Sequence, residues 1–278
     1  MLEMYVKYLK VNKMSERTIQ TYVGYVEKMS KYINKPDEEI TYIDLTDWAS
    51  TFSHLAPASI ALAFNAVKNY FKFLKRAGLI ETDPSAELKV PNSKHKEKKY
   101  LSREDVSNII RCASTFKNKA ILYMFATTGI RFSELANITL DDYKKAINGN
   151  RQIVILGKGS KERSIYINED VKEMVEYMLK TRPDDSCDKL FVNSTGGMVK
   201  EQSVNKMLKS ASKKAGIEFW NEVSPHWLRA AFATIADDNG VPIGIISKAM
   251  GHASIATTSV YVKVHQNQIN AVSMDMRF

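Results

Sequence analysis

The stretch SPHWLRAAFATIADDNGVPIGIISKAMGHASIATTSVYVKV, residues 224–264, holds two histidines, an arginine and a tyrosine. His226 and Arg229 are three residues apart in a segment whose apolar residues recur at helical intervals, so both polar side chains can project from one face of a helix. His252 follows a glycine, and Tyr261 lies nine positions further on. A phosphodiester attacked by a tyrosine oxygen needs cationic hydrogen-bond donors around its non-bridging oxygens, because negative charge builds there in the transition state. The stretch combines a nucleophile with such donors.

These residues resemble the active-site signature of the tyrosine recombinases, the Xer and phage integrase family, which is HxLR, then a Gly-His pair, then a tyrosine. HWLR, GH and TTSVY occur here in that order. Upstream, TTGIRFSEL is similar to the family's segment with the first catalytic arginine, and LGKGSKERSIYI resembles the β-hairpin with its catalytic lysine. The resemblance spans about residues 100–265, and several motifs in a fixed order rarely coincide by chance.

The resemblance implies how the reaction would proceed. Tyr261 would attack a DNA phosphate, giving a 3′-phosphotyrosine and a free 5′-hydroxyl, and the covalent link would store the bond energy so that no high-energy cofactor is needed. An ordinary tyrosine has a pKa near 10, so it must lose its proton during the attack. His226 is the nearest candidate base, and Lys158 is the expected acid for the leaving 5′-oxygen.

The resemblance also assigns the phosphate ligands. Arg131 and Arg229 would hold the non-bridging oxygens with planar guanidinium groups, which lysine would not replace well. His252 would donate a further hydrogen bond. Arg131 lies at an expected bend between two helices, and from the residues alone a simple ion pair with Glu134 is the first expectation. Family resemblance makes Arg131 a phosphate ligand that Glu134 orients.

Hydrophobic periodicity predicts a mainly α-helical chain with a small β-sheet. By resemblance, residues 1–90 form a helical bundle of the SAM-like, core-binding type, and residues 100–278 form an α+β catalytic domain, so that the two close on DNA as a clamp. Between them, PNSKHKEKK at residues 91–99 is lysine-rich without a hydrophobic period, which is typical of a linker.

The N-terminal part has the pattern of a series of helices. Ser15 is expected to cap one that ends before Lys35, and others are expected over about residues 43–52 and 58–77. The last of these carries a basic edge formed by Lys68, Lys72, Lys75 and Arg76. A solvated helix face is the ordinary interpretation of such an edge, whereas the family resemblance favours contact with DNA phosphates.

Residues 152–167 change from a helical to an alternating pattern around a Gly-Lys-Gly-Ser turn, which predicts a β-hairpin with Lys158 near its tip. An ordinary hairpin with a solubilising lysine is the alternative. Lys161 and Arg163 are expected to contact the DNA backbone rather than take part in the chemistry. Helices are expected at about residues 169–181 and 200–215, with a short strand from Leu190 to Val192 between them.

Composition agrees with a polyanionic partner. Forty Lys and Arg against 31 Asp and Glu give a net charge of +9, although a merely basic protein is the alternative. Two cysteines without CxxC spacing indicate a reducing cytoplasm and neither a disulfide framework nor a zinc site. The three Asp-Asp pairs lack further ligands at metal-binding spacing, so we infer no metal and no cofactor. No apolar run is long enough to span a membrane.

The expected function is site-specific DNA recombination. The partner would be double-stranded DNA with inverted-repeat half-sites, bound by a tetramer that the C-terminal tail links, in the cytoplasm at the nucleoid. The lack of an extra N-terminal arm-binding domain favours Xer-type resolution of chromosome dimers at a dif-like site over integration or excision of a mobile element. A type IB topoisomerase and a catalytically silent DNA-binding protein are weaker alternatives, because the bundle is Xer-like and all six catalytic groups are present.

Overall fold

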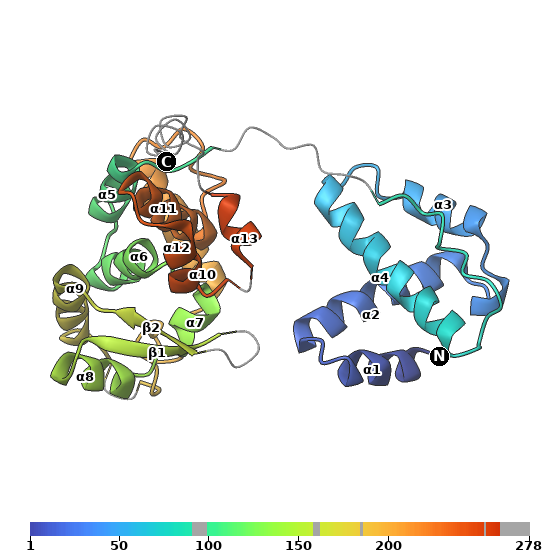
Figure 1. Cartoon of the computed structure of the whole chain (residues 1–278), viewed down its shortest axis with the longest axis horizontal. Helices are drawn as coiled ribbons and strands as arrows, with labels where there is room; N and C mark the ends of the chain where they lie inside the picture. Colours follow the sequence, from blue (N-terminus) through green and yellow to red (C-terminus); the bar gives the residue numbers. More distant parts are fainter. Residues whose placement is uncertain (91–98, 158–161, 184–185, 253, 262–278) are drawn as a thin grey trace, which may run out of the picture. The chain divides into compact units, whose positions relative to one another are not determined.

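The structure is a computed structural model that describes residues 1–90, 99–157, 162–183, 186–252 and 254–261. The chain divides into two compact units, Met1–Lys98 and Lys99–Phe278. The described residues are mainly helical with one two-stranded sheet (Figure 1), so the predicted fold class is confirmed. Among them, no helix combines the length and the apolar character needed to cross a bilayer.

The N-terminal unit is a bundle of helices around its own core. Ser15 caps α2 as predicted, because its hydroxyl accepts a hydrogen bond from the backbone N–H of Thr18 (3.2 Å). Pro57 occupies the first turn of α4, where its missing N–H removes no helical bond. The helices pack through apolar stripes that bury side chains such as Met29 and Phe71. The elements are α1 (Leu2–Val11), α2 (Glu16–Ile33), the 3₁₀ turn η1 (Asp37–Glu39), α3 (Tyr42–Ser50) and α4 (Pro57–Arg76).

The second unit packs its helices around α6, which is buried on nearly all sides and contacts α9 and α11. Two helix starts are fixed by capping boxes, in which Ser102 pairs with Asp105 and Thr139 pairs with Asp142. The helices are α5 (Arg103–Arg111), α6 (Phe116–Thr128), α7 (Phe132–Asn137), α8 (Leu140–Asn148), α9 (Glu169–Leu179), α10 (Glu201–Lys214), α11 (Pro225–Asp238), α12 (Ile243–Met250) and α13 (Ile255–Ser259).

The sheet is the predicted hairpin, formed by β1 (Gln152–Leu156) and β2 (Glu162–Tyr166) in antiparallel register. Figure 1 shows it beside α8, and its buried face packs into the core of the unit. The prediction of a strand from Leu190 to Val192 is wrong, because only isolated β-bridges occur there, at Lys189 and Val192. Neither bridge continues into a ladder, and Leu190 is fully buried together with its neighbour Phe191 instead of alternating with it.

Two helices of this unit end at glycines in the left-handed conformation. Gly129 ends α6 with φ 59° and Gly251 ends α12 with φ 65°, a region that glycine enters without steric cost. Gly129 is also closely packed, since a Cβ at this position would lie 2.6 Å from the ring of Phe232 on α11. The end of α6 is therefore pressed directly against α11.

We expect Gly129→Ala to destabilise the protein more than Gly216→Ala. Both glycines have positive φ (59° and 76°), which costs an alanine about 1 kcal/mol, but nothing lies within 4 Å of a Cβ at Gly216. The additional clash with Phe232 should cost at least about 1 kcal/mol more. Urea unfolding followed by circular dichroism measures both values, and equal losses would contradict the close packing of α6 on α11.

Candidate active site

The guanidinium group of Arg229 lies where two helices end. Arg229 projects from α11 and is only 3% exposed. It donates to the carbonyl oxygen of Gly129 at the end of α6, and to that of Met250, the last residue of α12 (2.7 Å). Carbonyls at helix C-termini lack helical partners and carry partial negative charge, so they suit a buried cation. Burial and the nearby charge of Arg131 lower the pKa of Arg229 to about 10, which leaves it charged at neutral pH.

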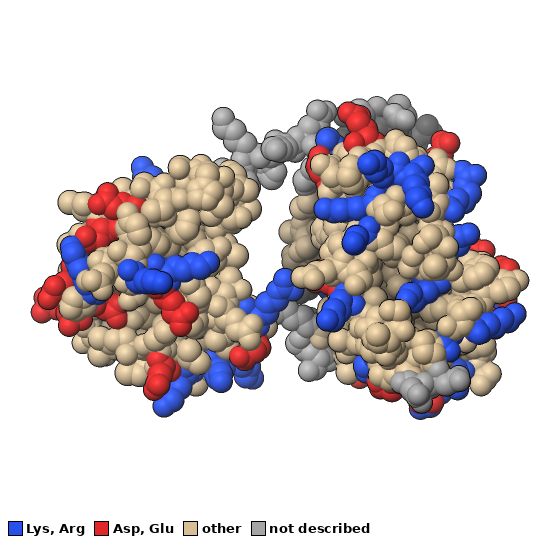
Figure 2. Space-filling view, turned by 180° about the vertical axis from the view of Figure 1, so that it is seen from behind, with Lys and Arg blue, Asp and Glu red and all other residues tan. Residues whose placement is uncertain are grey.

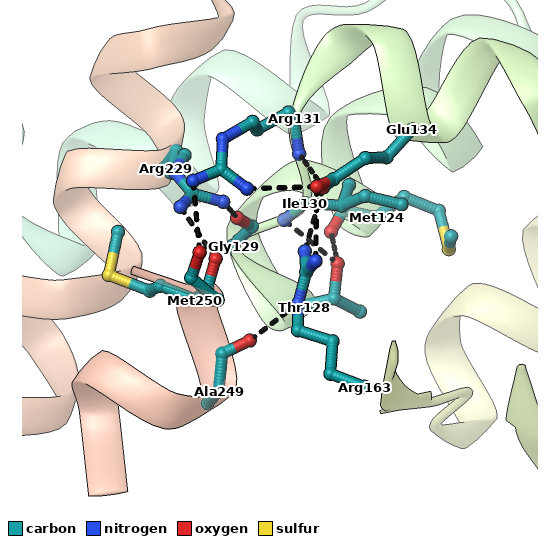
Figure 3. A network of polar contacts seen from close by, with 11 residues as sticks. Met124, Thr128, Gly129, Ile130, Arg131, Glu134, Arg163, Arg229, Ala249 and Met250 are labelled. Atoms are coloured by element: carbon teal, nitrogen blue, oxygen red, sulfur yellow. Dashed lines mark hydrogen bonds and ion pairs between the residues drawn. The ribbon is translucent and has the colours of Figure 1, made fainter. Parts of the chain in front are cut away.

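Arg131 and Arg163 share the carboxylate of Glu134 (Figure 3). Arg131 stands just before α7, and both its backbone N–H (2.8 Å) and its guanidinium (2.9 Å) donate to Glu134. Arg163 on β2 donates to both carboxylate oxygens, at 3.0 and 2.7 Å, and its Nε donates to the carbonyl of Ala249 (2.9 Å). One carboxylate thus joins the start of α7 to the hairpin, and Arg163 joins the hairpin to α12.

This network leaves the site positively charged. Burial by itself raises the pKa of Glu134, but the hydrogen bonds from Arg163 and Arg131 outweigh it and lower that pKa to about 2. Glu134 is therefore ionised at neutral pH. Three guanidinium groups around one carboxylate give a local charge of +2 (3 − 1), counting Arg229 with the other two arginines. An excess of positive charge with outward hydrogen-bond donors is suited to a phosphodiester.

The two arginines on Glu134 differ in their access to solvent. The side chain of Arg131 is 37% exposed, so the ion pair with Glu134 and the binding of an outer anion are compatible. From the sequence we expect Arg163 to contact DNA, whereas the structure turns this side chain inward and leaves it 9% exposed. Arg163 lies two residues before the buried Ile165 on β2, so strand alternation is the signal that could have placed it inside. We assign Arg163 to positioning Glu134.

The hydroxyl of Tyr261 lies 2.7 Å from Nε2 of His226. His226 projects from the first turn of α11, and Tyr261 follows α13. Displacement of water and repulsion by Arg229 and Arg131 lower the pKa of His226 below 6.5, so its ring is neutral at pH 7. Burial raises the pKa of Tyr261, although the same two arginines act in the opposite direction. The tyrosine is thus protonated at rest and has a proton acceptor within reach.

His252 directly follows the Gly251 cap and lies beside Tyr261, with 6.3 Å between ring centroids. Burial, followed by the charges of Arg229 and Arg131, lowers the pKa of His252 to about 4. Its Nδ1 lies 2.7 Å from the hydroxyl of Thr258, a residue of the TTSVY motif to which the sequence assigned no role. The structure therefore brings together five of the six expected catalytic residues: Arg131, His226, Arg229, His252 and Tyr261.

Other expected site residues fall outside the described part of the chain. These are Lys158 and Lys161, which lie between β1 and β2 in sequence, and the whole tail after Tyr261. Within the described ranges, no three His, Cys, Asp or Glu side chains gather as metal ligands would.

The basic edge of α4 lines a groove of about 800 Å³ in the N-terminal unit. Lys72, Lys75 and Arg76 are exposed there. Lys68 has a structural role instead, because its ammonium donates to the carbonyls of Ala86 (3.0 Å) and Leu88 (2.8 Å) after the helix. Lys and Arg side chains also spread over a face of the second unit, with Asp and Glu mainly toward its edges (Figure 2).

Family models match both parts of the chain. A family model described as "Phage integrase family" matches residues 99–268, and one described as "Phage integrase, N-terminal SAM-like domain" matches residues 2–78. The chain therefore belongs to the phage integrase family. It is 31% identical to tyrosine recombinase XerD of Halalkalibacterium halodurans, over 98% of this chain and 95% of the relative. It is 33% identical to tyrosine recombinase XerA of Pyrococcus horikoshii, over 95% of this chain and 88% of the relative.

Solved structures share the fold. XerH site-specific recombinase bound to difH substrate, in a pre-cleavage complex, has a TM-score of 0.75 at 20% identity, over 99% of this chain and 84% of that one. A lambda integrase tetramer bound to a Holliday junction has a TM-score of 0.75 at 16% identity, over 95% and 79%. With the relatives, this confirms the resemblance seen in the sequence: the protein is a Xer-like, tyrosine-type site-specific recombinase.

We expect Glu134→Gln to lower the free energy of unfolding by about 3 kcal/mol at pH 7, which is the scale of a pKa lowered from 4.5 to about 2. A depressed carboxyl pKa stabilises the fold above the unfolded pKa, and this contribution is lost as pH falls toward 2. The gap between wild type and variant should therefore shrink below about pH 4.5 in urea titrations. Glu222→Gln is the control, since the Glu222 pair with Lys99 is exposed and worth under about 1 kcal/mol. Similar losses for both variants would refute the role of Glu134.

Proposed function

We propose that Tyr261 is the nucleophile with which this recombinase cuts and rejoins DNA. The observation that carries the proposal is the 2.7 Å contact between the Tyr261 hydroxyl and Nε2 of His226, beside the charged Arg131 and Arg229. A bond forms between the tyrosine oxygen and phosphorus while the bond from phosphorus to the 5′-oxygen breaks. The tyrosine proton passes to the neutral His226. A free 5′-hydroxyl then attacks the phosphotyrosine in the reverse sense and rejoins the strands.

In this reaction the two arginines and His252 stabilise the negative charge that builds on the phosphate. Arg229 is fixed by two carbonyl oxygens and Arg131 by Glu134, so neither must reorganise when charge builds on the phosphate. His252 donates a hydrogen bond from its neutral ring. Lys158 protonates the leaving 5′-oxygen, and Lys161, Lys72, Lys75 and Arg76 contact the DNA backbone.

We further propose that the substrate is a dif-like chromosomal site with inverted-repeat half-sites, where the enzyme resolves chromosome dimers at the nucleoid. Support comes from the full-length likeness to Xer relatives. Recombination exchanges four strands between two duplexes, so four chains would act together. Mapping the bound DNA in cells tests this role, because one peak near the replication terminus is expected, whereas binding at an attachment site would mean integration.

Tyr261→Phe should bind its DNA site but form no covalent complex, because only the attacking oxygen is removed. The measurement is trapping on a nicked suicide substrate, resolved by denaturing electrophoresis. Tyr177→Phe serves as the matched control, since this exposed ring stacks on Phe116 away from the site residues and should leave trapping unchanged. A covalent complex formed by the Tyr261→Phe variant would show that another residue is the nucleophile.

Lys158→Ala should slow cleavage of ordinary DNA but regain most of its rate when the leaving 5′-oxygen is replaced by sulfur, which departs without a proton. Lys161→Ala provides the comparison, because a backbone contact should affect both substrates alike. Single-turnover rates on the two substrates decide the matter. Equal defects of Lys158→Ala on oxygen and sulfur would exclude it as the acid.

A further inference from the structure

Thr258 is a fully buried residue of α13 that touches the site without having been assigned a part in it. Its hydroxyl lies 2.7 Å from Nδ1 of His252. Its carbonyl accepts the backbone N–H of Tyr261 at 2.9 Å. One threonine therefore holds the ring that precedes α13 and the backbone of the tyrosine that follows it.

The surroundings of His252 keep its ring neutral. The positively charged or basic groups that act on it come from the start of α7, from β2 and from α11: Arg131, Arg163, His226 and Arg229. The ring of Tyr261, which follows α13, also lies beside it, with 6.3 Å between ring centroids. Together with burial they oppose a second proton on the imidazole. A neutral imidazole has a single N–H, on either Nδ1 or Nε2, and the hydrogen bond made by one nitrogen decides the state of the other.

The hydrogen bond to Thr258 decides between these two tautomers. Among the residues that the structure describes, Nδ1 of His252 is the only hydrogen-bond partner of the Thr258 hydroxyl. If Nδ1 carried the hydrogen, the hydroxyl would accept it, and the buried hydrogen of the hydroxyl would find no acceptor among the described residues. A buried donor left without an acceptor costs about 1 to 3 kcal/mol. If the hydroxyl donates instead, both groups are satisfied. Nδ1 is then the acceptor, and the hydrogen lies on Nε2.

We propose that Thr258 is a positioning residue that holds His252 in the Nε2–H tautomer, so that the ring offers a donor and not a lone pair to the phosphate. This inference rests on the proposed function, in which His252 donates to the phosphodiester. The wrong tautomer would direct a lone pair at a developing oxyanion and would oppose the reaction. Because Thr258 also carries the backbone contact to Tyr261, the donor and the nucleophile are held by the same helical turn.

Three variants separate this role from simple packing. Thr258→Val keeps the branched shape and removes the hydroxyl, and Thr258→Ser keeps the hydroxyl. Thr257→Val makes the same change at the exposed neighbouring position of α13, whose side chain makes no hydrogen bond to His252 among the described residues. Urea unfolding of all three establishes that they remain folded.

The first measurement is the tautomer of His252 in the free protein, from long-range ¹H–¹⁵N spectra of histidine-labelled samples, with the signal assigned by its loss in His252→Gln. Wild type, Thr258→Ser and Thr257→Val should show the Nε2–H form, and Thr258→Val a mixture of both forms. An unchanged spectrum in Thr258→Val would overturn the inference. This measurement needs no DNA, so a wild type without cleavage activity would contradict the proposed function and not the tautomer assignment.

The second measurement is single-turnover cleavage. Thr258→Val should be about 3 to 10 times slower, the scale of one net hydrogen bond, with DNA affinity unchanged, and Thr258→Ser should regain most of the rate. In a His252→Ala background, Thr258→Val should slow cleavage less than about twofold, because its effect passes through the ring. The same loss in both backgrounds would mean that Thr258 only supports α13, and the inference would fall.

Discussion

The buried guanidinium group of Arg229 is the constraint on which the rest of the site depends. A buried charge must have its hydrogen bonds satisfied. Here the carbonyl oxygens at the ends of α6 and α12 accept hydrogen bonds from the guanidinium. Each helix stops at a glycine in the left-handed conformation. A site residue follows each glycine closely in sequence. Arg131 lies two residues after Gly129, and His252 directly follows Gly251. The helix ends that accept the hydrogen bonds of Arg229 therefore also place Arg131 and His252 in the site.

Glu134 connects the hairpin to the same site through its ion pairs with Arg131 and Arg163. An arginine cluster without an anion would repel itself, and a carboxylate without cations would not stay ionised at this depth. By binding Arg131 and Arg163 together, Glu134 joins α7 to β2 while leaving the local charge at +2. Gly251 takes part in this packing, because a Cβ there would lie 3.0 Å from the guanidinium of Arg163. The anion therefore organises the cations without neutralising them.

The cations in turn fix the protonation states of their neighbours. Both histidines have lowered pKa values, so each is neutral near pH 7. Their tasks then differ through hydrogen bonding. His226 faces the Tyr261 hydroxyl with Nε2, whereas His252 faces Thr258 with Nδ1. Two residues of one type can therefore serve as acceptor and donor in one site.

The sequence by itself determined most helices, the hairpin and the order of the site motifs, because caps and hydrophobic periods act over a few residues, as at Ser15. Only the tertiary structure decided which side chains those motifs turn inward. Lys68 donates to carbonyls 18 and 20 positions away, so no local pattern could separate it from cations that face solvent. Alternation along β2 could place Arg163 inside, but it could not identify the partner Ala249, which lies 86 positions away in sequence. The contact of Thr258 with His252 spans only six residues, yet it depends on the turn between α12 and α13. Such contacts are set by the packing of whole elements, and a local pattern does not encode them.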